Sequence, residues 1–189
     1  MNETDLLKYS NYLKKRNFKG LLYRKYFLYP IISKNLKGKC LDIGCGIGDF
    51  LKFRGKNTFG VDINKNTIEY CLTQKLNVKF YRDIIPHKNE EFDSIVLDNV
   101  LEHIEKPNLL IEEMHRVLKN NGKLLIGVPG LKGFEFDSDH KKFYDEMSML
   151  DVISKSLFKD IKFFYTPFKS NFLNKYLKQY CLYGLFEKK

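Results

Sequence analysis

Tryptophan is absent from this chain, and proline and cysteine are scarce, with five prolines and four cysteines among 189 residues. The cysteines show neither C-x-x-C nor zinc-finger spacing, which argues against a structural zinc site and a thioredoxin-like redox motif. We interpret Cys40, Cys45 and Cys71 as small buried residues of a strand, a turn and a helix. Such unpaired thiols are typical of a reducing compartment.

Long apolar runs are missing as well. No segment approaches the ~20 residues that a helix needs to cross a bilayer. The acidic, polar residues 1–5 are unlike a secretory signal. These absences predict a cytoplasmic location, and a chain of this length and composition predicts one domain with a substantial core.

Charge is unbalanced, with a formal net charge of +10 at pH 7. One interpretation is a lysine-rich surface that aids solubility. The other is an anionic substrate or surface, such as a phosphorylated sugar, a lipid phosphate or RNA. The composition alone leaves both open.

The most informative stretch is LDIGCGIGDF, residues 41–50, in which a short apolar run stops at Gly44, Gly46 and Gly48. It predicts a strand, a tight turn and a helix, with bare backbone against which a ligand can lie. A dinucleotide fingerprint fails, because the third glycine of G-x-G-x-x-G would fall on Asp49. The carboxylate of Asp42 would repel a pyrophosphate but attract an ammonium or sulfonium group. S-adenosylmethionine carries both cations and no phosphate.

This stretch resembles motif I of the class I S-adenosylmethionine-dependent methyltransferases. The resemblance covers residues 36–189 and implies an α/β fold with a doubly wound, seven-stranded, mostly parallel Rossmann-like sheet whose seventh strand is antiparallel. Residues 1–35 are expected to form an N-terminal helical lid or cap, and residues 36–189 the methyltransferase domain. The apolar runs place the strands at residues 39–43, 58–63, 77–81, 92–97, 123–130, 160–165 and 179–186.

The resemblance assigns cofactor contacts by position. Asp62, 20 residues after Asp42, would bind the ribose hydroxyls, although an N-cap-like role is the alternative. Asp83 would accept from the adenine amino group, with a plain loop acid as the alternative, and Asp98 and Asn99 would contact the methionine part. The expected cofactor-binding residues are Asp42, Gly44, Cys45, Gly46, Gly48, Asp62, Ile63, Asp83, Ile84, Asp98 and Asn99.

Two histidines are candidates for chemistry at the acceptor. His140, in the loop after the fifth strand, could take a proton from an acceptor hydroxyl, with Asp137 or Asp139 orienting it. The same three residues could bind a divalent metal, but we expect no metal site. His103 lies in a Leu-Glu-His segment that resembles one in the family, where a structural or cofactor-wall role is favoured over a base.

Several local predictions can be checked directly. We expect residues 3–36 to be helical, with an aromatic segment that ends at Pro30. We also expect Leu72 to face inward, Met147 to share one helix face with Leu150, Ile153 and Leu157, and residues 120–122 to form a turn. Residues 168–189 should supply a lysine-rich helix and the last strand, and the alternative is a basic amphipathic membrane patch.

The resemblance extends to small-molecule and sugar methyltransferases of bacterial surface-polysaccharide and secondary metabolism. It implies O-methylation of a sugar, a lipid-linked sugar or a similar metabolite, with no nucleic-acid partner. An RNA or protein methyltransferase is an alternative, but residues 98–101 (DNVL) lack the Asn-Pro-Pro-Tyr-like segment of base or glutamine N-methylation. A second alternative is that the chain is a non-catalytic partner subunit that binds S-adenosylmethionine.

Overall fold

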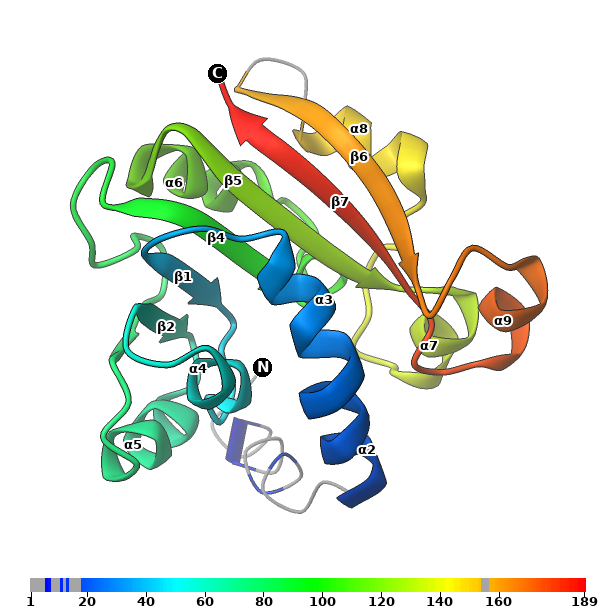
Figure 1. Ribbon diagram of the computed structural model, residues 1–189, viewed down its shortest axis with the longest axis horizontal. Helices are drawn as coiled ribbons and strands as arrows, with labels where there is room; N and C mark the ends of the chain where they lie inside the picture. The colour runs from blue at the N-terminus through cyan, green and yellow to red at the C-terminus, as the bar shows by residue number, and fades with distance from the viewer. Residues whose placement is uncertain (1–5, 8–10, 12, 14–17, 154–156) are drawn as a thin grey trace.

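A single twisted sheet with helices on both faces forms the frame of the molecule in the computed structural model (Figure 1). The structure describes all residues except 1–5, 8–10, 12, 14–17 and 154–156. The strand order is β3-β2-β1-β4-β5-β7-β6, and β7 is antiparallel to both of its neighbours. The strands are β1 (Cys40–Ile43), β2 (Thr58–Asp62), β3 (Val78–Phe80), β4 (Phe92–Asp98), β5 (Leu118–Pro129), β6 (Phe158–Thr166) and β7 (Cys181–Lys188). The predicted fold class is confirmed.

Helices connect these strands and also precede them. The described helices are α2 (Phe18–Tyr23), the π-helical turn η1 (Arg24–Leu28), α3 (Tyr29–Lys34), α4 (Asp49–Arg54), α5 (Lys65–Thr73), the 3-10 turn η2 (Leu101–His103), α6 (Asn108–Val117), α7 (Leu131–Phe136), α8 (Glu146–Ile153) and α9 (Asn171–Tyr176). None of the described helices is both long and apolar enough to cross a bilayer.

The two faces of the sheet build two apolar cores, because side chains alternate along each strand. Leu41 and Ile43 of β1 point into the larger core, which α6 and α8 cover. Cys40 of the same strand points into the other core, where Ile32 of α3 and Phe50 of α4 pack. Residues 28–36 therefore pack directly on the sheet.

The N-terminal helical segment continues past Pro30, so the predicted end at that residue is wrong. Pro30 lies in the first turn of α3, and the Tyr29 N–H donates to the Arg24 carbonyl in the preceding π turn. A wider turn accommodates a proline, which lacks the N–H for the usual i→i−4 bond and crowds the carbonyl of residue i−4. Most of the predicted helix before Phe18 lies outside the described residues.

Three local predictions differ from the structure. Leu72 is 54% exposed and Met147 is 75% exposed. The inward positions of α5 and α8 are instead taken by Cys71 and Met149. Residues 120–122 form no separate turn, because β5 begins at Leu118, directly after α6. The left-handed Asn121 (φ 60°) belongs to an irregularity at the start of that strand.

The C-terminal residues form β7 between β5 and β6, as predicted. Leu182 and Phe186 point into one core and Cys181, Tyr183 and Leu185 into the other. A strand that is buried on both faces cannot also lie on a membrane surface, so the membrane-patch alternative is wrong for residues 181–188.

Candidate functional site

A glycine turn joins β1 to α4 at the carboxyl edge of the sheet. Gly44, Gly46 and Gly48 all have left-handed backbones, with φ of 75°, 53° and 75°. The Gly44 N–H donates to the Val61 carbonyl over 2.8 Å, which ties the turn to β2. A Cβ on Gly44 would overlap the Val100 side chain. This turn therefore requires glycine at its first position for both conformation and space.

Asp62 closes the other side of the turn. Its Oδ2 accepts a hydrogen bond from the Gly46 N–H and its Oδ1 one from the Asn64 N–H, each over 2.8 Å. The side chain is buried, and burial raises its pKa while these backbone donors lower it. The carboxylate thus holds the turn in place and keeps further lone pairs available to a ligand.

Three carboxylates end adjacent strands at this edge. Asp42 lies in β1, Asp62 ends β2 and Asp98 ends β4. The pKa of Asp42 is raised well above the ordinary value, first by burial and then by the charges of Asp98 and Asp62. Buried like charges of this kind favour a cationic ligand and disfavour an anionic one.

Asp98 is held by the predicted Asn99 and by Tyr183, which the sequence did not single out. The Tyr183 hydroxyl of β7 donates to its Oδ1 over 2.8 Å, and the Asn99 side-chain amide donates over 3.0 Å. Gly127 of β5 lies between Asp98 and Tyr183, since a Cβ on this residue would meet both side chains. A glycine in a buried strand flanked by a tyrosine on the next strand is the signal that could have revealed this contact.

Arg24 of η1 is a second residue that sequence reasoning missed. Burial lowers the pKa of its guanidinium, but Tyr29, Asp98 and Tyr183 together raise it well above the usual value. The N-terminal helical segment thus contributes a cation near the carboxylate that ends β4. Nothing in the helical pattern of residues 18–34 distinguishes Arg24 from its basic neighbours.

The remaining predicted cofactor residues follow β1, β2 and β3 in the chain. Cys45 is buried beside Gly60 of β2. Ile63 is 51% exposed and Ile84 is 71% exposed, and Asp83 is exposed beside it. Because β2 and β3 run parallel and adjacent, the residues that follow them emerge side by side. Exposed isoleucines here offer apolar surface to a planar ring.

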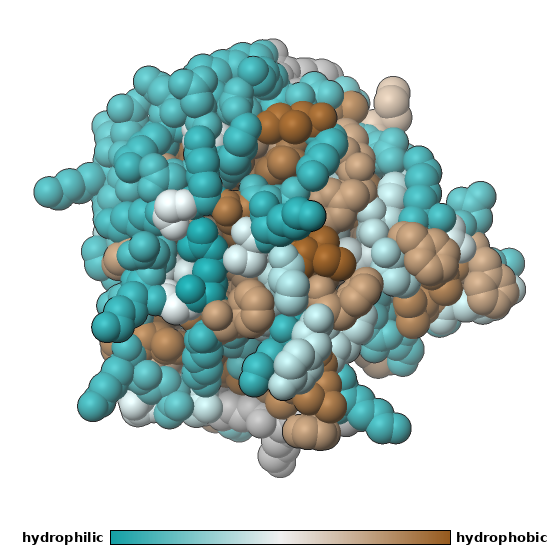
Figure 2. Space-filling model, in the orientation of Figure 1, coloured by the Kyte–Doolittle hydropathy of each residue, from teal (hydrophilic) through white to brown (hydrophobic). Residues whose placement is uncertain are grey.

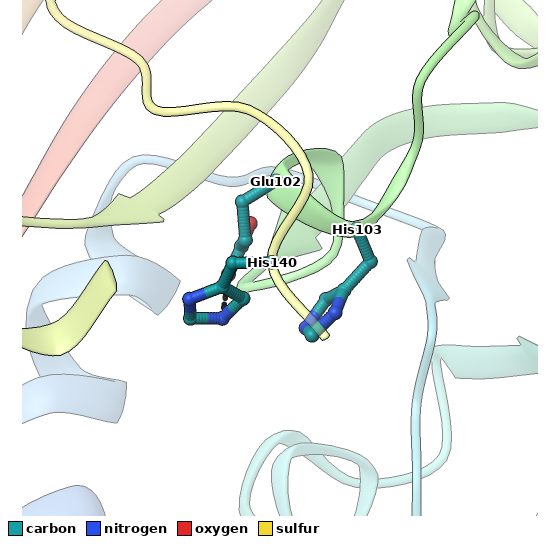
Figure 3. Close-up of side chains that lie close together, drawn as sticks. All are labelled: Glu102, His103 and His140. Carbon is teal, nitrogen blue, oxygen red and sulfur yellow. Dashed lines mark ion pairs between the residues drawn. The ribbon is translucent and has the colours of Figure 1, made fainter. Parts of the chain in front are cut away.

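A cluster of the buried Glu102 and the half-buried His103 and His140 lies just beyond β4 (Figure 3). The His140 Nε2 is 3.7 Å from Glu102 Oε1, and the rings of His103 and His140 are 4.6 Å apart. The Glu102 carboxyl is 1% exposed, and neither of its oxygens has a hydrogen-bond partner. Burial raises its pKa to about 8, with smaller contributions from Asp98 and Asp137.

Backbone contacts dock the loop that carries His140 onto η2. The N–H groups of Lys141 and Lys142 donate to the Glu102 carbonyl over 2.7 and 3.1 Å. The His140 Nδ1 lies 2.8 Å from the Phe134 carbonyl, so Nδ1 carries the proton and the lone pair resides on Nε2. The ring contacts of His140 are thus the Phe134 carbonyl and Glu102, and not the predicted orienting acids. Asp137 instead accepts from the Asp139 N–H within its own turn.

A hollow in the surface lies near the amino ends of β1 and β4. It measures about 730 Å³ and is lined by basic residues that include Lys39, Lys79 and Arg116, and also by the predicted adenine contact Ile84. Lys39 pairs with Glu91, Arg116 with Glu113, and Lys79 donates to the Pro86 carbonyl. These cations are therefore engaged, and the glycine turn lies at the other edge of the sheet.

Comparisons with known proteins agree with this geometry. A family model described as a methyltransferase domain matches residues 41–126. The uncharacterized protein MJ1123 of Methanocaldococcus jannaschii is 36% identical in an alignment over 146 residues, which covers 70% of this chain and 70% of that protein. The ubiquinone biosynthesis O-methyltransferase of Pseudomonas syringae pv. tomato is 28% identical over 102 residues, spanning 48% of this chain and 44% of that protein.

A solved structure shows a similar arrangement. The N-methyltransferase NodS from Bradyrhizobium japonicum WM9, in complex with S-adenosyl-L-homocysteine, matches with a TM-score of 0.67. The match covers 98% of this chain and 97% of that one, at 16% sequence identity. At that identity the likeness concerns the fold.

Proposed function

This chain belongs to the class I S-adenosylmethionine-dependent methyltransferases, and we propose that it methylates a hydroxyl oxygen of a small molecule, with a sugar or lipid-linked sugar as the acceptor class. It is an enzyme of the methyl-transferring class, and its cofactor is S-adenosylmethionine. That cofactor supplies an electrophilic methyl group on a sulfonium. The protein has to orient the acceptor, exclude water and remove a proton.

The residues at the glycine turn fit the cofactor. Asp62 is proposed to accept from the ribose hydroxyls, since its oxygens retain lone pairs beyond those that Gly46 and Asn64 use. Asp42 and Asp98 are proposed to neutralise the cationic methionine part. Asp83 and Ile84 are proposed to contact the adenine, where the exposed isoleucine offers apolar surface.

The acceptor side is proposed to lie at the cluster of Glu102, His103 and His140. A hydroxyl is a weak nucleophile, and a group that removes its proton during the attack raises the rate. The Nε2 of His140 has a free lone pair, because Nδ1 is bonded to the Phe134 carbonyl. His140 is therefore the proposed site of proton removal, and His103 is the second candidate.

Two observations support an oxygen acceptor of modest size. The Pseudomonas relative is an O-methyltransferase by name. Aromatic rings also surround the His140 loop: Phe134 stacks on the imidazole, while Phe136 and Phe143 are partly or largely exposed beside it. Aromatic faces bind the apolar faces of sugar rings and of phenols, so both classes belong in the first screen.

The observation that carries the proposal is the buried Glu102–His140 pair beside three carboxylates at the same sheet edge. The test is transfer of labelled methyl from S-adenosylmethionine to a panel of nucleotide sugars, lipid-linked sugars, phenols and RNA. We expect an alkali-stable methyl ether on a hydroxylated small molecule, and His140→Ala should lower turnover with little change in cofactor affinity. His115→Ala, on α6, is the matched control.

Other outcomes of that screen favour the other candidates. Label in RNA, with affinity that falls steeply as salt rises, would support a nucleic-acid substrate that uses the +10 charge. Label in a protein side chain would support protein methylation. Cofactor binding without transfer to any acceptor would favour a non-catalytic partner subunit and contradict the proposal.

A further inference from the structure

The cluster of Glu102, His103 and His140 has the donor set of a metal site. Each residue offers one ligand atom, and these atoms all lie within 4.8 Å of one another. Two imidazoles and one carboxylate suit zinc and other divalent transition metals. Three protein ligands leave at least one coordination position open, as in catalytic zinc sites.

The Glu102 carboxyl supports a ligand independently of this spacing. It is 1% exposed, and neither oxygen accepts or donates a hydrogen bond. A buried polar group without a partner is costly, and such a group in a native structure calls for an explanation. A cation bound between Glu102 and the two imidazoles would give the carboxylate the partner that it lacks. Figure 3 shows the carboxylate directed toward the His140 ring from η2.

The histidines are also prepared for coordination. The His140 Nδ1–H is bonded to the Phe134 carbonyl, which leaves the Nε2 lone pair on the side of Glu102. Metal-bound histidines commonly donate their other ring N–H to a carbonyl in this way. The Lys141 and Lys142 N–H bonds to the Glu102 carbonyl fix the distance between the two segments that carry the ligands.

We propose that Glu102, His103 and His140 bind one divalent transition-metal cation, whose open position takes the acceptor oxygen. Binding of the ion is inferred from the spacing of the three ligands and from the unpartnered Glu102 carboxyl. The role of the ion in methyl transfer rests on the proposed function. Coordination lowers the pKa of the bound hydroxyl. The proton leaves to water, the oxygen attacks the methyl carbon, and the carbon–sulfur bond breaks to give neutral S-adenosylhomocysteine. His140 then acts as a metal ligand and not as a free base. This proposal departs from the sequence-based expectation that the chain has no metal site.

Zinc and cobalt are the probes for the site itself. The chain is purified without a histidine tag, stripped with a chelator and then reloaded with excess Zn²⁺. It is expected to retain about one Zn²⁺ after dialysis, measured by mass spectrometry. Co²⁺ in its place should give the visible absorption of a low-coordinate nitrogen–oxygen site. Glu102→Gln and His140→Ala should each weaken Zn²⁺ binding at least tenfold, whereas His115→Ala and Glu105→Gln should not.

Folding and cofactor binding are checked in the same variants. Circular dichroism and titration with S-adenosylhomocysteine should match the unmodified chain, so that a lost ion is not a lost fold. Retention of no ion by the unmodified chain, or equal retention by His140→Ala, would overturn the site. These assays need no acceptor, so their result is separate from the outcome of the acceptor screen.

The catalytic part has its own test once an acceptor is found. Removal of the ion should abolish transfer, and Zn²⁺, Mn²⁺ or Co²⁺ should restore it to different extents, while affinity for S-adenosylhomocysteine stays constant. Full activity of the stripped enzyme would overturn the role of the ion at the acceptor oxygen and return proton removal to His140.

Discussion

At the scale of single residues, Asp62 combines a structural and a ligand-binding position. Its two oxygens hold the N–H groups of Gly46 and Asn64, and the side chain is only 8% exposed. A substitution therefore affects the turn and the proposed ribose contact together. The two effects can be separated because one appears in unfolding and the other in ligand titration.

Asp62→Ala should weaken binding of S-adenosylhomocysteine roughly 10- to 100-fold, since hydrogen bonds to a charged group contribute about 1.5–3 kcal/mol. It should also lower the free energy of unfolding by about 1–3 kcal/mol for each orphaned N–H. Calorimetric titration well below the unfolding temperature measures the first effect, and denaturant unfolding the second. Asp160→Ala, at an exposed position of β6, is the control. Unchanged ligand affinity in Asp62→Ala would refute the ribose assignment.

The ionisation of Asp42 should make the affinity for S-adenosylhomocysteine depend on pH. Its pKa is raised by burial and by Asp98 and Asp62, so the free protein holds a proton there at pH values where an ordinary aspartate is ionised. The ammonium group of the cofactor, which S-adenosylhomocysteine also carries, favours the ionised form. Affinity for S-adenosylhomocysteine should therefore rise with pH through the raised pKa and then level off, and binding in mildly acidic buffer should release protons.

The stability of the free protein changes with pH in the opposite direction to its affinity for the ligand. A raised carboxyl pKa means that the folded state binds more protons than the unfolded state above the ordinary aspartyl pKa, so the free energy of unfolding of the free protein falls as pH rises through the raised value. Calorimetry in buffers of different ionisation enthalpy measures the proton release. Asp42→Asn should remove it, and identical release in that variant would contradict the assignment.

At the scale of elements, glycines with different surroundings separate conformational strain from space. Gly44 has a φ of 75° and faces Val100, Gly55 has a φ of 87° in open space, and Gly20 lies in α2 with no close neighbour. The three positions make an internal series for one substitution.

Alanine at these positions should give three different outcomes. Gly44→Ala should lower the free energy of unfolding by about 2–4 kcal/mol, because a left-handed backbone and overlap with Val100 add together. Gly55→Ala should lower it by about 1–2 kcal/mol from strain alone, and Gly20→Ala should raise it by about 0.5–1 kcal/mol. Denaturant unfolding checks the order. Equal losses for Gly44→Ala and Gly55→Ala would show that contact with Val100 contributes nothing.

The sequence predicted elements well wherever the pattern was buried on both sides. Apolar runs such as residues 92–97 become central strands, and their order follows from the resemblance. It was harder to predict which faces of the peripheral helices are buried. Met147 and Met149 fit a helical stripe equally, and the choice depends on Gly184, whose missing side chain leaves room for the Met149 sulfur. That contact joins residues far apart in the chain, so local periodicity does not contain it.

The candidate site divides in the same way. The glycine turn and Asp62 lie in local motifs and could be found from spacing. Glu102 could not be paired with His140, because that neighbour depends on how residues 137–142 dock on η2. The nearer acids in sequence, Asp137 and Asp139, were the natural choice, but the Asp137 carboxylate accepts from the Asp139 N–H within their own loop. Tyr183 and Arg24 also reach Asp98 only through the fold.

At the scale of the whole molecule, residues 168–189 divide into a buried strand and a preceding helix with exposed aromatic side chains. The last part forms β7, which joins β5 to β6 and contributes to both cores. The preceding α9 carries outward aromatics, with Phe172 69% and Tyr176 60% exposed. The view of Figure 2 shows hydrophobic side chains gathered at the end of the molecule where Figure 1 places α9. Any contact with a membrane would therefore involve α9 and not the final strand.

Two phenylalanines 14 positions apart test this division. Phe186→Ala should lower the free energy of unfolding by about 3–5 kcal/mol, because Phe186 is fully buried and its removal leaves a cavity. Phe172→Ala should change it by less than about 0.5 kcal/mol, as for other exposed sites. In sedimentation with anionic vesicles, any binding by the unmodified chain should fall in Phe172→Ala, with Phe168→Ala as the companion from the adjoining loop. A stable Phe186→Ala chain that loses vesicle binding would mean that β7 is available to the membrane after all, against its place inside the sheet.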